Sequence, residues 1–138
     1  MKLAAVASLL AFCTASVLGD QVTYNQVYDN ANQSLSTVAC SNGANGLLTK
    51  NFTTFGSLPT FPFIGGASAI ASWDSANCGT CWNVTFNGTS ITILAIDVAK
   101  NGFNVGLTAM NNLTHGDAVQ VGLVQATSSQ LNASACGL

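Results

Sequence analysis

The 138-residue chain contains no arginine and no glutamate, and charged residues make up only 6% of it. Its formal net charge is −2. Because binding to a phosphate backbone requires clustered lysine and arginine side chains, this composition argues against a nucleic-acid partner. Attraction to an anionic membrane surface is disfavoured for the same reason. The surface must instead be covered by neutral polar groups, and such a surface is weakly protected against self-association.

Groups suited to catalysis are equally scarce, since histidine occurs once and aspartate is the only acidic residue type. Glycoside hydrolysis usually needs two carboxylates across the scissile bond, and only Asp97 has a strand-end position suited to catalysis. Two roles for the Asp97 side chain are equally compatible with the sequence. It could contact a ligand, or it could accept hydrogen bonds from backbone N–H groups of the turn. His115, followed by Gly116, is predicted to cap a helix rather than to bind zinc. We expect no cofactor and no enzymatic activity; the alternative is weak glycan cleavage with Asp97 as a lone acid.

Residues 1–19 read as a secretory signal peptide, with Lys2 before an apolar run and cleavage after Gly19. An uncleaved membrane anchor would need roughly 20 continuous apolar residues, and Thr14 and Ser16 interrupt this run. We therefore expect no membrane span and assign residues 20–138 to one secreted domain. Cys13 leaves with the signal, and the four remaining cysteines are expected to form two disulfides in any of three pairings.

Short β-strands dominate the predicted secondary structure. Asn87-Gly88 is the strongest hairpin signal, because a type I′ turn needs positive φ at both positions. Helical turns are expected over residues 107–113 and a short helix over 67–72. Residues 101–106 are predicted to form a turn cluster. These elements favour a mainly β chain, closed or nearly closed into a barrel. The predicted strands cover residues 21–29, 35–39, 82–86, 91–96 and 119–127.

A group of phenylalanines and a Cys-Gly-Thr-Cys motif could suggest function, but a structural role is favoured for both. Phe52, Phe55, Phe61 and Phe63 lie in an irregular stretch and are predicted to pack under a long loop rather than to form a ligand platform. The motif Cys78-Gly-Thr-Cys81 precedes a strand rather than a helix, so a thioredoxin-like redox site is disfavoured. Each of its cysteines is expected to bond to a distant partner.

Asn-x-Ser/Thr triplets occur six times and mark candidate N-glycosylation sites. We expect two or fewer of them to be occupied. Asn87, in the tight hairpin turn, is predicted to be poorly accessible to the transferase. The other candidates are Asn32, Asn51, Asn83, Asn112 and Asn132.

From residue 22 to the C-terminus the chain resembles the cerato-platanin family of small secreted fungal proteins. The resemblance includes the stretch VTYNQVYDNANQSLSTVACSNGANGL, the central CGTCWNV and the closing ACGL. The order and spacing of all four cysteines agree with the family.

The resemblance implies a six-stranded double-ψ β-barrel with short helices and two disulfides, Cys40 with Cys78 and Cys81 with Cys136. It also implies a protein of the extracellular space or cell wall, without catalytic activity. A shallow polar groove would bind chitin or N-acetylglucosamine oligomers, with expansin-like loosening of polysaccharide. Plants would recognise the protein through a receptor as an elicitor of defence, and it would self-associate at interfaces. A surface-active, self-assembling protein is therefore a further alternative.

The same resemblance assigns groove residues by position. Asp97 and Asn104 match the strand-end aspartate and the asparagine of the GFN turn. The remaining groove residues implied are Ser41, Gly43, Gly65 and Gly66. The chain departs from the family at two positions, with Asn42 in place of aspartate and Val98 in place of histidine. A histidine beside Asp97 could share a proton with it, so Val98 further weakens a catalytic interpretation.

Overall fold

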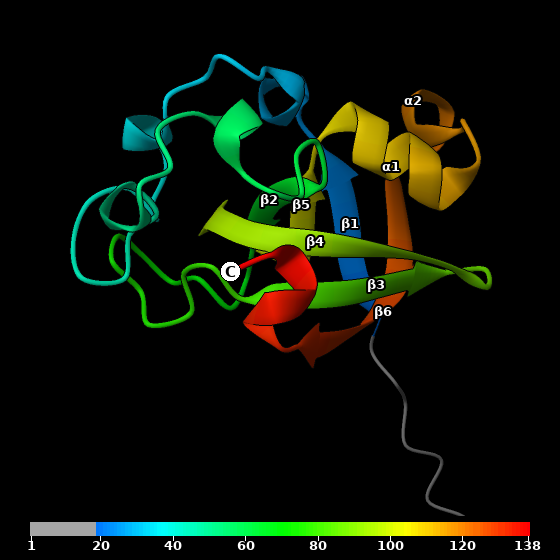
Figure 1. Cartoon of the computed structure of the whole chain (residues 1–138). Helices are drawn as coiled ribbons and strands as arrows, with labels where there is room; N and C mark the ends of the chain where they lie inside the picture. The colour runs from blue at the N-terminus through cyan, green and yellow to red at the C-terminus, as the bar shows by residue number, and fades with distance from the viewer. Residues whose placement is uncertain (1–18) are drawn as a thin grey trace, which may run out of the picture.

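The computed structural model describes residues 19–138, which form a β-barrel with short helices around it (Figure 1). Of the predicted signal peptide, only Gly19 belongs to the described residues. Residues 1–18 lie outside them, so the signal peptide and its cleavage after Gly19 stay predictions. Within the described residues, no helix combines the length and the apolar character needed to cross a membrane.

Six strands close the barrel in the order β1-β5-β2-β4-β3-β6. β1 runs parallel to β5 and β2 runs parallel to β4, whereas the other neighbouring pairs are antiparallel. This confirms the six-stranded double-ψ barrel implied by the family resemblance. The strands are β1 (Asp20–Tyr24), β2 (Ile64–Ala67), β3 (Cys81–Phe86), β4 (Thr89–Val98), β5 (Phe103–Val105) and β6 (Leu123–Leu131).

The hairpin of β3 and β4 forms as the sequence predicts. Asn87 and Gly88 connect the strands with φ of 46° and 77°, the positive values that a type I′ turn requires. Val84 pairs with Ile91 and both side chains are buried. The alternation of apolar and polar residues therefore fixes the register of this hairpin.

Two of the predicted strand segments form 3₁₀ helices instead. Residues 35–39 contain η2 (Leu35–Thr37), which begins where the Ser34 hydroxyl accepts the Ser36 N–H. Residues 21–29 are strand only as far as Tyr24 and continue into η1 (Gln26–Asp29), capped by the Asn25 side chain. In both cases a short polar side chain binds nearby backbone, which competes with a β-ladder.

Two strands were missed because their sequences lack strand character. β2 contains Gly65 and Gly66, and residues 67–72, predicted as a helix, instead include the end of this strand and a turn. β5 has three residues and lies inside the predicted turn cluster. Both strands are held by neighbours on each side, so tertiary pairing outweighs local propensity here.

The helix predicted over residues 107–113 is confirmed as α1 (Leu107–Thr114). His115 follows it with φ of 54° and donates its N–H to the Asn111 carbonyl, which confirms its predicted role as a cap. A second short helix, α2 (Ala118–Val121), occupies the start of the segment predicted as the last strand. The strand β6 consequently begins at Leu123 and not at residue 119.

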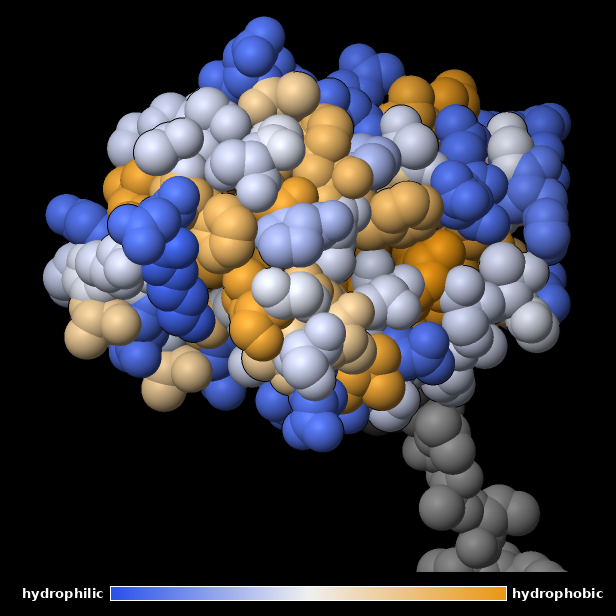
Figure 2. All heavy atoms as spheres, viewed as in Figure 1, coloured by the Kyte–Doolittle hydropathy of each residue, from blue (hydrophilic) through white to orange (hydrophobic). Residues whose placement is uncertain are grey.

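The hydrophobic core contains Phe55, which is 1% exposed, with Phe52, Phe61 and Phe63 partly buried against it. The packing role predicted for these four rings is confirmed. In the view of Figure 2, hydrophobic and hydrophilic residues alternate in small areas over the surface. Among residues 19–138 the exposed large hydrophobic residues are Val27, Trp73, Val98, Val119, Val121 and Leu123.

Both disulfides implied by the family resemblance are present. Cys40 bonds to Cys78 across 38 positions, and Cys81 bonds to Cys136 across 55. Neighbouring Cys78 and Cys81 are therefore not paired with each other, and each connects to a distant segment. The second disulfide fastens the C-terminal 3₁₀ helix η5 (Ala133–Cys136) to the barrel.

Candidate functional site

Asp97, Gly66 and Asn104 lie in one row across three neighbouring strands. Gly66 on β2 pairs with Asp97 on β4 and, at its other edge, with Asn104 on β5. Because neighbouring strands are about 4.8 Å apart, the backbones of the two polar residues are separated by about 10 Å. The structure thus brings together three of the six groove residues implied by the resemblance.

Gly65 and Gly66 are needed for the close approach of these strands. A Cβ atom on Gly66 would lie 2.6 Å from the carbonyl oxygen of Val98, and one on Gly65 would lie 2.3 Å from the carbonyl oxygen of Asn104. Both glycines are buried. Their contribution to the site is therefore the spacing of β4 and β5 rather than an exposed surface.

The Asp97 carboxylate accepts three hydrogen bonds from the protein. Oδ1 accepts the N–H of Ala39 at 3.0 Å and that of Val98 at 2.9 Å. Oδ2 accepts the hydroxyl of Tyr28 at 3.1 Å. Bonding to backbone N–H groups, one of the two explanations of Asp97 left open by the sequence, is present in the structure. Contact of Asp97 with a ligand stays a prediction.

Tyr28 is only 4% exposed and stacks on Phe55 with ring centroids 5.9 Å apart. Burial raises the pKa of its hydroxyl well above the ordinary value, and the charge and hydrogen bond of Asp97 raise it further. The hydroxyl therefore keeps its proton and remains a donor to Asp97 at physiological pH. Tyr28 fixes the position of the carboxylate.

Asn104 borders an open hollow of about 280 Å³. Its Oδ1 atom is buried and has no hydrogen-bond partner among the described residues. A buried acceptor of this kind requires a partner, and a ligand hydroxyl or amide reaching into the hollow could donate to it. The other residues lining the hollow are Gln21, Thr23, Val98, Ala99, Lys100 and Asn101.

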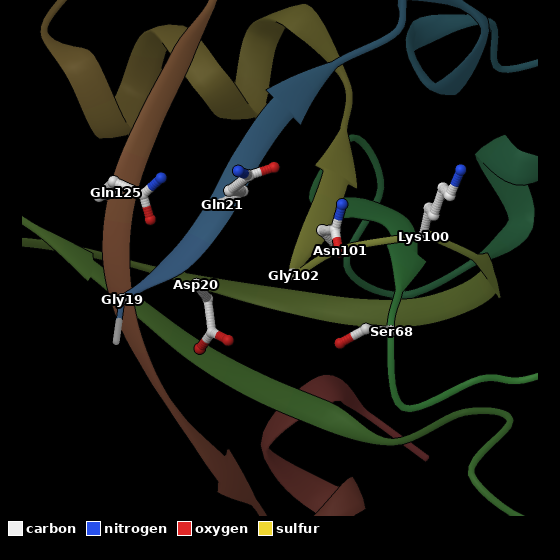
Figure 3. Close-up of a pocket in the computed structure, with 8 residues that line it drawn as sticks. All are labelled: Gly19, Asp20, Gln21, Ser68, Lys100, Asn101, Gly102 and Gln125. Atoms are coloured by element: carbon white, nitrogen blue, oxygen red, sulfur yellow. The ribbon is translucent and has the colours of Figure 1, made fainter. Parts of the chain in front are cut away.

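A second hollow has a volume of about 490 Å³, and Figure 3 shows the residues that line it. The two share Gln21, Lys100 and Asn101, so we treat them as one feature and call it the amide groove. Figure 3 shows the side chains of the second hollow coming from β1, β6, the β4–β5 connection and the segment after β2. The second hollow adds Gly19, Asp20, Ser68, Gly102 and Gln125 to the lining.

The charges of the side chains that line the amide groove balance. Asp20 and Lys100 are the charged residues that line it, and the Ser128 hydroxyl already donates to Asp20. Its remaining polar side chains are amides and hydroxyls, which both donate and accept hydrogen bonds. Such a lining is suited to a neutral ligand with many hydroxyl or amide groups.

Most residues that line the amide groove are not predicted as site residues from the sequence. Gln21 and Gln125 form a cross-strand pair between β1 and β6, and they alternate with buried Val22 and Val124. That alternation marks them as outward-facing. Their meeting with Asn101, however, depends on the pairing of β1 with β5 and β6, which local patterns do not give.

Ser41 and Gly43 lie in a separate loop and do not line the amide groove. Ser41 is buried, and its hydroxyl donates to Oδ1 of Asn42 at 3.3 Å. Gly43 has φ of 96°, and a Cβ there would lie 2.7 Å from the Asp74 carboxylate. The loop approaches the row at Cys40, whose N–H donates to the Ile96 carbonyl.

The two departures from the family fall in different surroundings. Val98 is 42% exposed and lines the smaller hollow together with Asn104. Asn42 is exposed beside Ser41 in the separate loop. The apolar Val98 side chain has no proton to exchange with Asp97.

The glycosylation triplets lie outside the amide groove. Asn32, Asn51, Asn112 and Asn132 are exposed, as is Asn87 in the hairpin turn, whereas Asn83 is half-buried. Their occupancy stays a prediction. Within residues 19–138 no group of three or more His, Cys, Asp or Glu side chains is arranged to hold a metal ion.

Comparison with known proteins gives a consistent result. The family model described as Cerato-platanin matches residues 21–138. The chain is 49% identical to Allergen Asp f 15 of Aspergillus fumigatus over 115 residues, which cover 83% of this chain and 75% of the allergen.

Two solved structures are also similar. Cerato-platanin 3 from M. perniciosa superposes with a TM-score of 0.84 at 48% identity, covering 87% of this chain and 99% of that structure. The solution structure of Cerato-Platanin, described as a fungal elicitor, superposes with a TM-score of 0.76 at 42% identity, covering 84% and 95%.

Proposed function

The chain belongs to the cerato-platanin family, and on that premise we propose that it is a secreted, non-catalytic protein that binds neutral cell-wall polysaccharide. Chitin and N-acetylglucosamine oligomers are the proposed ligands. The family consists of small secreted fungal proteins, which supports a location outside the cell or in the cell wall for this chain.

The observation that carries the proposal is the composition of the amide groove around Asn104. A neutral sugar chain is held by hydrogen bonds and packing rather than by charge, and the lining of this groove contains several amides and hydroxyls. The acetamido group of N-acetylglucosamine is both donor and acceptor. Its N–H is a suitable partner for the buried Oδ1 of Asn104.

The surroundings of Asp97 argue against a catalytic role. Its carboxylate already accepts three protein hydrogen bonds and does not line the amide groove. A glycosidase needs two carboxylates placed across one bond. If incubation with chitin produced new reducing ends, and Asp97→Asn abolished them, the non-catalytic assignment would be wrong.

Titration with chitohexaose followed by NMR tests the proposal. We expect weak binding, with amide shifts concentrated at Gln21, Asn101 and Asn104, and a loss of about tenfold in affinity for Asn104→Ala when its hydrogen bond is removed. Gln130→Ala is the matched control, because Gln130 is an exposed amide on β6 outside the groove. Absence of shifts in the groove at millimolar ligand rejects it.

Two activities would follow from binding to a cell wall. The first is expansin-like loosening of polysaccharide, measured as extension of cellulose paper under load without release of reducing sugars. The second is elicitor activity through a plant receptor, as the relative described as a fungal elicitor suggests. Leaf infiltration with wild type and Asn104→Ala would show whether the response depends on the amide groove.

A second candidate function is surface activity with self-assembly at interfaces. It is favoured by the exposed apolar residues near α2, where Val119, Val121 and Leu123 are 66%, 46% and 42% exposed. Low charge over the rest of the chain would permit close approach of such surfaces.

A further inference from the structure

Trp73 is 59% exposed, an unusual state for the largest apolar side chain. The other tryptophan, Trp82, is half-buried and packs edge-on against Phe103 with centroids 5.7 Å apart. Trp73 is nevertheless fixed, because its indole N–H donates to Oδ1 of Asn42 at 2.9 Å. The edge of the ring is thus bound to the protein while much of its surface is open to solvent.

The loop around Trp73 is held in place on both sides. Asp74 has φ of 57°, and its carboxylate accepts the N–H of Asn45 at 2.8 Å. The amide of Asn45 donates back to the Asp74 carbonyl at 3.1 Å. The Cys40–Cys78 disulfide closes the same region. A ring held by such a network loses little conformational entropy when a ligand contacts it.

The loop is connected directly to the row of Asp97. Ala39 donates its N–H to Asp97 and accepts the N–H of Asp74 at 3.2 Å. Two hydrogen bonds, both made by Ala39, therefore connect the backbone of Asp74, the neighbour of Trp73, to the Asp97 carboxylate. In Figure 1 the segment between β2 and β3 extends to the left of the barrel, on the side opposite α2.

We propose that Trp73 is a stacking platform for one sugar ring of a neutral polysaccharide, at the Asp97 end of the site and separate from the amide groove. This inference rests on the proposed carbohydrate-binding function. A pyranose ring has an apolar face of C–H groups, which the electron-rich face of indole attracts. Its hydroxyl groups point outward in the plane of the ring, and the exposed Asn42 amide, bound to the indole N–H through Oδ1, is a polar group beside the ring.

The surroundings of Trp73 favour a sugar over an apolar partner. Its neighbours in sequence are Ser72, Asp74 and Ser75, so the ring is an isolated apolar area within polar residues. A membrane or an apolar protein surface would require a larger continuous patch. A sugar ring, apolar on its face and polar at its rim, matches an isolated ring of this kind.

The roles of Ser41 and Gly43 also follow from this assignment. Ser41 donates to the same Asn42 oxygen that accepts the indole N–H. Gly43 leaves room for the Asp74 carboxylate. Both residues therefore support the platform instead of lining the amide groove, and Trp73 is the group that would contact the ligand.

Intrinsic fluorescence with chitohexaose as the probe tests the platform, because the chain has two tryptophans in different surroundings. We expect ligand to shift the emission of Trp73 to shorter wavelength. Trp73→Phe should bind within a few fold of wild type by calorimetry but lose this spectral change. Trp73→Ala should bind about tenfold more weakly, which corresponds to the lower end of the loss when an aromatic ring that stacks on a nucleic-acid base is removed.

Val119→Ala is the matched control, since Val119 is an exposed apolar residue on α2, and this substitution should leave binding unchanged. Equal affinity of Trp73→Ala and wild type would overturn the platform while leaving the proposed function intact. An unchanged spectral shift in Trp73→Phe would also overturn it, since Trp82 would then be the reporter. Absence of binding by wild type would reject the proposed function itself.

Discussion

At the scale of single residues, Tyr28 shows how burial and a neighbouring charge set the chemistry of the site. Its hydroxyl pKa is raised by burial first and by Asp97 second. The folded state therefore holds this proton at pH values where the unfolded chain has released it, above about pH 10. Linkage then requires the free energy of unfolding to decrease as the pH rises beyond that value, because the unfolded state binds fewer protons.

Replacing Tyr28 by phenylalanine tests this linkage. Tyr28→Phe should lower the free energy of unfolding by about 1–2 kcal/mol at neutral pH through loss of the hydrogen bond to a carboxylate, and the alkaline loss of stability should become smaller. Urea unfolding between pH 7 and 11 measures both effects. Tyr24→Phe is the control, since Tyr24 makes no side-chain hydrogen bond within residues 19–138. Equal alkaline slopes in wild type and Tyr28→Phe would contradict the assignment.

A second prediction concerns the close packing of strands at Gly66. Gly66→Ala places a methyl group against the Val98 carbonyl, at 2.6 Å before relaxation, and should destabilise the fold by about 1–3 kcal/mol. Gly88→Ala is the comparison, because Gly88 has open space around it but a φ of 77°, where strain alone costs roughly 1 kcal/mol. Denaturant unfolding of both variants separates crowding from backbone strain. A smaller loss for Gly66→Ala would show that the strands can separate there.

At the scale of elements, the position of α1 depends on one carboxylate from a distant segment. Asp29 in η1 accepts the N–H groups of Leu107 at 2.6 Å and Thr108 at 3.1 Å. These are donors that the helix itself leaves unsatisfied. Asp29→Ala should lower the free energy of unfolding by about 1–2 kcal/mol.

Asp117→Ala is the matched control for Asp29, because Asp117 precedes α2 but its side chain makes no capping hydrogen bond. Its removal should change stability by less than about 0.5 kcal/mol. Thermal unfolding followed by circular dichroism distinguishes the two. Similar losses for both variants would mean that Asp29 acts through general electrostatics rather than through its two hydrogen bonds.

The elements that the sequence predicts well are those whose own residues determine them. The hairpin at Asn87-Gly88 and the helix α1 both form as expected, because turn chemistry and periodicity are local. β2 and β5 could not be found this way, since Gly65 and Gly66 become strand only where β4 and β5 flank them. The same limit applies to the site, because Gln125 and Asn101 meet only through barrel closure.

The residue types of the site were easier to anticipate than its shape. Asp97 and Asn104 could be assigned from family resemblance, and the structure places them in one row with Gly66. Trp73 carried no periodic signal, since it lies between strands in an irregular stretch. Only the Asn42 contact and its exposure mark it as more than a core residue.

At the scale of the whole molecule, low charge and exposed apolar residues bear on association. Val119 is 66% exposed and lies on α2, close in sequence to Val121 and Leu123. In wild type we expect surface tension to fall as protein concentration rises, since this area can enter an air–water interface. Charge elsewhere opposes such association only weakly, because the formal net charge is −2.

Val119→Asp, compared with a second charged variant, distinguishes the effect of the apolar area on surface activity from the effect of net charge. A carboxylate there must be desolvated at the interface, so the concentration that lowers surface tension should rise several-fold. Val27→Asp adds the same charge at a residue 37% exposed in η1, an element separate in sequence from α2, and should shift that concentration much less. Because both variants carry equal net charge, a difference between them can come only from where the charge is placed. Equal shifts would assign surface activity to net charge and would remove the α2 area from the explanation.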